Sequence, residues 1–119
     1  MEMPELADLI WLFEDEPTSM DEDLTWPVGL QSFRLRRGSR EVLFSLDPTS
    51  GEAYLTMFEP GEEVMTIGRI RKLKSLTIEK RDEYEGLILH FNSDELDPLQ
   101  LQTRPVIHLS WNVMALGVW

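Results

Sequence analysis

Two histidines are the residues in this chain best suited to chemistry, because an imidazole can bind a metal ion or transfer a proton near neutral pH. His90 lies in the segment Leu87–Phe91, and His108 lies in the segment Val106–Leu109. Both alternate away from the more apolar side of their segments, so we expect them to lie close together if these segments pair as strands. Together with Tyr54 they are the predicted lining of a small-ligand site.

The motifs that define most catalytic and metal sites are missing from the sequence. There is no HExxH pair, no GxSxG turn and no glycine-rich phosphate loop. The chain has no cysteine, which excludes disulfides, thiolate metal sites and a Cys nucleophile. Two acidic clusters, 21–23 and 94–97, lack the alternating ligands and turn glycine of a calcium loop. We therefore predict a non-enzymatic protein with no metal ion and no cofactor.

Negative charge is concentrated at one end of the chain. The first 29 residues contain nine carboxylates and no Lys or Arg, and the whole chain has a net charge of -11. Segregated charge favours a basic partner or a basic surface on the same molecule. The predicted partner-binding residues are six acids that would steer a basic protein and one aromatic contact: Glu14, Asp15, Glu16, Asp21, Glu22, Asp23 and Trp26.

Two other interpretations of this acidic end remain open. The acids could pack against the basic residues of the domain itself, which are Arg34, Arg36, Arg40, Arg69, Arg71, Lys72 and Lys74. They could also serve solubility alone. The net charge argues against two classes of partner, nucleic acids and anionic membranes, because both repel an acidic protein.

The N-terminal part of the chain predicts one helix followed by a linker. Pro4 suits the first turn of a helix, and Leu6, Leu9, Ile10 and Phe13 form an apolar stripe over residues 4–14. Trp11 and Leu12 fall outside this stripe, which predicts that the helix is covered on more than one side. Residues 15–29 contain prolines, a glycine and acids, and we predict that they form an irregular acidic linker.

From residue 30 the apolar pattern alternates with a period of two, which indicates β-strands. Turn signals recur about every ten residues, so residues 30–113 are predicted to form a meander of seven to eight strands. No intervening segment is long enough for a crossover helix, which favours antiparallel pairing. The predicted fold is mainly β, a sandwich or partly open barrel with one short N-terminal helix. Residues 114–119 are predicted to be an apolar tail, and residues 1–119 are predicted to form a single domain.

The sequence also predicts a cytoplasmic protein. It has no cysteine, and it has no basic segment of the kind that begins a signal peptide. The longest early apolar run, Leu9–Phe13, is far shorter than a membrane span.

In size, charge and absence of catalytic motifs the chain is similar to the small immunity proteins that neutralise bacterial toxins. This similarity is one of composition, and it implies an acidic interaction module that docks on or neutralises a basic protein. Two alternatives belong to other classes. One is a small-ligand-binding barrel or sandwich that uses Tyr54, His90 and His108. The other is a homodimeric structural accessory protein that pairs through a partly apolar sheet face.

Overall fold

The computed structural model describes residues 2–19, 23, 25–60, 62–92 and 96–111. Within these residues the chain forms one helix and nine strands. Their bounds are α1 (Leu6–Phe13), β1 (Thr18–Ser19), β2 (Gln31–Arg37), β3 (Arg40–Asp47), β4 (Glu52–Phe58), β5 (Glu63–Ile70), β6 (Leu73–Arg81), β7 (Tyr84–Phe91), β8 (Leu99–Arg104) and β9 (His108–Ser110). No helix in this part of the chain is long and apolar enough to cross a membrane. The predicted mainly β class with one short helix is confirmed.

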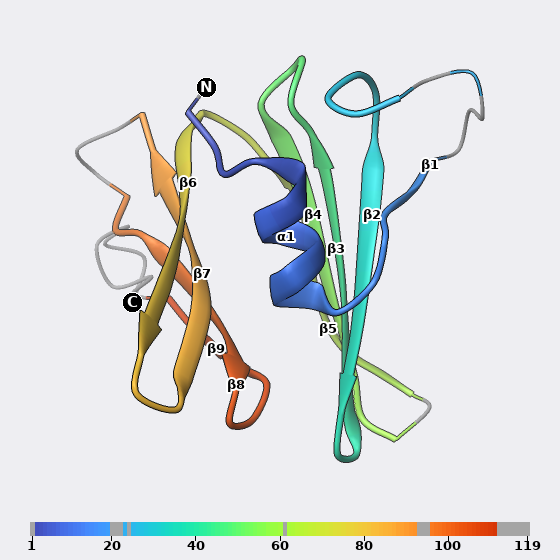
Figure 1. Ribbon diagram of the computed structural model, residues 1–119, viewed down its shortest axis with the longest axis vertical. Coiled ribbons are helices and arrows are strands. Elements are labelled where there is room, and N and C mark those ends of the chain that lie inside the picture. The colour runs from blue at the N-terminus through green and yellow to red at the C-terminus, as the bar shows by residue number, and fades with distance from the viewer. Residues whose placement is uncertain (1, 20–22, 24, 61, 93–95, 112–119) are drawn as a thin grey trace.

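The strands form two antiparallel sheets that face each other (Figure 1). The first sheet has the order β1-β2-β3-β4-β5, and the second has the order β6-β7-β8-β9. Each strand pairs with its neighbour in sequence, so the fold is a meander split between β5 and β6. The sheets do not close into a barrel, which favours the sandwich of the two predicted architectures. The strand β1 has two residues and lies within the segment predicted to be an irregular linker.

The core lies between the sheets and follows from the alternation of the strands. Phe33 and Phe44 from the first sheet and Leu87 and Leu89 from the second are completely buried. Every second residue of a strand faces the same side, so the period of two in the sequence becomes one apolar face on each sheet. Burial of this apolar surface is the main force that holds the two layers together.

The helix α1 lies between the two sheets along one side of the sandwich (Figure 1). Leu9, Leu12 and Phe13 are buried, and the ring of Phe13 stacks on Phe33 and Phe44 with centroid distances of 5.2 and 5.9 Å. The helix ends where Glu14 adopts the left-handed conformation, at φ 64°. The helix is thus a component of the core, and its end directs the chain toward β1.

Candidate protein-binding surface around α1

The solvent side of α1 and the segments next to it form an acidic surface. The described carboxylates of the first 29 residues are all exposed: Glu2, Glu5, Asp8, Glu14, Asp15, Glu16 and Asp23. No Lys or Arg lies in this part of the sequence. Asp21 and Glu22, which belong to the predicted partner-binding set, lie outside the described residues. Because the buried side of α1 is apolar, the carboxylates lie where a protein partner can contact them.

Two of the predicted residues line one groove between α1 and the acidic linker. Its volume is about 420 Å³, and its lining includes Leu6 and Ile10 of α1 together with Glu16 and Trp26 of the linker. The Trp26 ring meets Phe33 edge-on, with centroids 6.0 Å apart, so the core fixes its position. The groove therefore combines an apolar floor with a carboxylate at its rim, which is a suitable arrangement for an apolar side chain next to a basic one.

Glu14 forms hydrogen bonds with arginines of the same chain. Its carboxylate Oε2 accepts hydrogen bonds from Arg37 and from Arg104 Nη2, the latter at 2.9 Å. Arg37 Nε also donates to the Thr103 carbonyl at 2.6 Å, and Arg104 Nε lies 3.2 Å from Glu85 Oε1. Since Arg37 ends β2 and Arg104 ends β8, this cluster ties the end of α1 to both sheets.

The electrostatics of the cluster follow from these contacts. The hydrogen bond from Arg37 lowers the pKa of Glu14 below its ordinary value, and the hydrogen bond and charge of Arg104 act in the same direction. Partial burial of the carboxylate opposes this effect. Glu14 therefore remains ionised at neutral pH. Sequence reasoning did not single out Arg37, Arg104 or Glu85, because residues so far apart in sequence give no local signal of their contact.

Three of the seven basic residues that the sequence offered as partners for the linker have other contacts. Arg34 and Arg36 both pair with Glu41, at 2.8 and 3.4 Å. Arg40 Nε lies 3.4 Å from Glu59 Oε1. These ion pairs join residues of the first sheet and its turns. Packing of the acidic end against its own domain is thus seen at Glu14, through arginines outside the proposed basic set.

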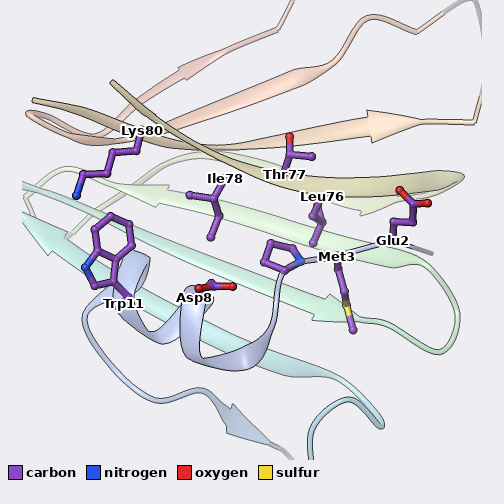
Figure 2. A pocket seen from close by; sticks show the side chains of 9 residues that line it. Glu2, Met3, Asp8, Trp11, Leu76, Thr77, Ile78 and Lys80 are labelled. Atoms are coloured by element: carbon purple, nitrogen blue, oxygen red, sulfur yellow. The ribbon is translucent and has the colours of Figure 1, made fainter. Parts of the chain in front are cut away.

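A second groove lies on the other side of α1, against β6 (Figure 2). Its volume is about 560 Å³, and its apolar lining includes Met3, Trp11, Leu76 and Ile78. Figure 2 shows Trp11 and Lys80 at one end of the groove and Met3 toward the other. Trp11 is 47% exposed, and Lys80 Nζ lies 4.7 Å from the centroid of its ring. Sequence reasoning missed this groove, although the position of Trp11 outside the apolar stripe was a signal for it.

The residues predicted to line a small-ligand site lie in different places. Tyr54 alternates with buried residues of β4 and faces outward from the first sheet, where its hydroxyl is 3.5 Å from Glu52. His90 faces outward from the second sheet, with Nε2 3.0 Å from Thr77 Oγ1. His108 is exposed on β9, and β8 separates its strand from that of His90. The structure does not bring the three together. No group of three or more potential metal ligands occurs in the described part of the chain.

Comparison with known proteins adds one likeness. No protein-family model matches the chain, and no curated protein sequence matches it. Among solved structures, it is similar to a chain of the "Contact-dependent growth inhibition toxin - immunity protein complex from Klebsiella pneumoniae 342". The TM-score is 0.78 at 20% sequence identity, and the match covers 92% of this chain and 93% of that chain. At this identity the likeness shows a shared fold.

Proposed function

We propose that this chain is a non-enzymatic, immunity-like protein that binds and neutralises a basic protein partner. The observation that carries the proposal is the exposed acidic surface around α1, which includes an apolar groove at Trp26. Paired positive and negative surfaces raise the rate of association, and a buried aromatic contact slows dissociation. The acids and the groove together supply both parts of a specific interface.

The shared fold supports this role. The neighbouring structure is a complex of a toxin with an immunity protein. Of these two roles, the immunity protein suits the present chain better, because its net charge is -11 and its sequence has no catalytic motif. A neutralising protein needs only an interface that covers the partner, and no chemistry of its own.

In this proposal the partner-binding residues have different roles. Asp15, Glu16 and Asp23 are exposed and steer the basic partner toward the surface. Trp26 and the apolar residues beside it receive one of the partner's side chains. Glu14 fixes the start of the linker through Arg37, so the acids that follow it begin from a defined position. Asp21 and Glu22 are proposed to add to the same attractive field.

The decisive experiment combines capture with a growth assay. Tagged protein is used to capture partners from a lysate of the source cells at about 50 mM and about 500 mM salt, because the screening length falls roughly threefold between these conditions. A captured basic protein is then cloned and expressed alone and with this chain. The proposal requires that it slows growth when alone, and that co-expression restores growth. A captured protein that is harmless alone, or equally harmful with this chain, contradicts the immunity role.

Charge-neutral variants then test the steering acids with the same purified partner. We expect the triple variant Asp15→Asn, Glu16→Gln, Asp23→Asn to lower the association rate constant several-fold and to flatten its dependence on salt. The control removes three other exposed acids, with Glu62→Gln, Asp82→Asn and Glu83→Gln, and so matches the change in net charge. An equal loss of association rate in both triple variants would show that only the net charge matters.

A further inference from the structure

The outer edge of β6 has backbone groups available for another strand. The Glu2 amide donates to the Lys74 carbonyl at 3.2 Å, and the Leu76 amide donates to the Glu2 carbonyl at 2.9 Å. The chain's own N-terminal residues thus begin a parallel strand beside β6, with a bridge between Glu2 and Ser75. The chain then diverges from β6, because it turns at Pro4 toward α1.

The direction in which the other backbone groups of β6 point follows from the pairing of β6 with β7. Since the Leu76 amide points to Glu2, it points away from β7, and the register of β6 with β7 is regular from Ser75 to Arg81. In an antiparallel pair, every second residue directs its amide and carbonyl away from the partner strand. Ile78 and Lys80 therefore direct theirs outward. Among the described residues, no other backbone group bonds to them from that side.

The same edge borders the groove between α1 and β6. Leu76, Ile78 and Lys80 form its wall on the sheet side, and Trp11 and Met3 belong to the opposite wall (Figure 2). A strand added to this edge would extend the second sheet toward α1. Every second side chain of that strand would then point into the groove, onto Trp11 and Ile78.

We propose that β6 receives an extended segment of the basic partner protein as an additional strand, with apolar side chains in the Trp11 groove and Lys or Arg side chains between them. This inference deepens the proposed function and rests on it for the identity of the partner. The negative charge around the groove, which Glu2 and Asp8 line, favours a basic segment through its field and not through direct ion pairs, because the Lys or Arg side chains of the added strand alternate to the face away from the groove. Its one described cation, Lys80, lies over the Trp11 ring.

The position of the groove supports the same occupant. Asp8 and Trp11 face this groove, while Leu6 and Ile10 of the same helix face the groove at Trp26. One partner that lies across α1 would therefore reach both grooves. A second copy of this chain is a poorer occupant, because each copy has a net charge of -11 and presents the same carboxylates at this edge.

A defined peptide tests the strand without the natural partner. The probe is acetyl-Lys-Val-Lys-Val-Lys-Val-amide, whose length of about 20 Å matches the free part of the edge. Acetyl-Glu-Val-Glu-Val-Glu-Val-amide is the control. In NMR titrations we expect a Kd of about 1 mM for the basic peptide, because a short flexible peptide loses much freedom on binding. The shifts should centre on the Ile78 and Lys80 amides and the Trp11 indole, and these amides should exchange more slowly with solvent.

A matched pair of variants isolates the backbone contact. Lys80→Ala removes the side chain and keeps the amide, whereas Lys80→Pro also removes the amide. Proline is tolerated where the amide of an edge strand faces solvent, so both variants should fold. We expect Lys80→Pro to bind the basic peptide about fivefold more weakly than Lys80→Ala, the effect of one lost hydrogen bond. If Lys80→Pro does not fold, slowed exchange of the wild-type Ile78 and Lys80 amides with bound peptide decides the question.

The outcomes separate this inference from the proposed function. Equal shifts with both peptides, no shifts at about 5 mM, or equal affinity of the two Lys80 variants would overturn the added strand. Shifts confined to residues 15–19 and Trp26 would also overturn it, and would leave the acidic linker as the binding site. Shifts at Ile78 that depend on the concentration of the protein alone would assign the edge to a second copy. Peptide binding at β6 together with a failed growth rescue would refute the immunity role and keep the strand-binding edge.

Discussion

The two sides of α1 differ in what they contribute. The inner side places Leu9, Leu12 and Phe13 in the core, each no more than 1% exposed. The outer side presents Asp8 and Trp11, and Trp11 is 47% exposed. One helix thus stabilises the sandwich with one side and, in the proposed function, contacts a partner with the other. We therefore expect that substitutions on the inner side change stability and that substitutions on the outer side change binding.

The greatest loss of stability is expected from a substitution on the inner side of α1. Phe13→Ala removes the ring that stacks on Phe33 and Phe44 and leaves a cavity between the sheets. We expect the free energy of unfolding to fall by about 3–5 kcal/mol, measured by urea denaturation. A loss below about 1 kcal/mol would mean that the core tolerates the cavity and that α1 is not essential to it.

The apolar stripe in the sequence predicted this inner side only in part. Leu9 and Phe13 of the stripe are buried, but Leu6 and Ile10 are half-buried and line the groove at Trp26. Leu12, outside the stripe, is buried. The buried residues Leu9, Leu12 and Phe13 have the i, i+3, i+4 spacing of a single helical stripe, which is rotated relative to the predicted one. Of the two residues on which the prediction of cover on more than one side depended, Leu12 is buried, whereas Trp11 is 47% exposed.

The fold class could be predicted because a period of two and frequent turns are local signals. The division into two sheets could not, because the short link Arg71–Lys72 between β5 and β6 resembles the other turns in the sequence. The contacts of Glu14 could not be predicted from the sequence either. Arg37 and Arg104 reach it from the ends of two strands in different sheets, and only the assembled sandwich brings these ends together.

A smaller effect on stability is expected on the outer side. Trp11→Ala removes a half-exposed ring and its contact with Lys80, which together stabilise the fold by about 1 kcal/mol. The same change removes the apolar wall of the groove beside β6, so binding of the Lys-Val peptide should be lost in the NMR titration. If Trp11→Ala destabilises the protein as much as Phe13→Ala does, the two sides of the helix are not separable.

The smallest effect is expected where α1 ends, and it depends on pH. Glu14 is paired with Arg37 and Arg104, and its pKa is lowered from an ordinary value of 4.5. A lowered pKa in the folded state means that ionised Glu14 stabilises the fold above the ordinary value, and that this stabilisation is lost as pH falls through the lowered pKa. Because the side chain is 41% exposed, solvent screening limits the contribution to about 0.5 kcal/mol.

Glu14→Gln should therefore lower the free energy of unfolding by about this amount at pH 7, and the difference from wild type should shrink as the pH is taken from about 4.5 toward 3. Asp15→Asn is the matched control, because Asp15 is adjacent, exposed and bonded only to the Glu16 amide among the contacts described for it. We expect no measurable change from this control in urea denaturation. A pH-independent loss in Glu14→Gln would show that the shape of the side chain matters at this position rather than its charge. Equal losses in both variants would remove the distinction between the carboxylate that ties α1 to the sheets and those available to a partner.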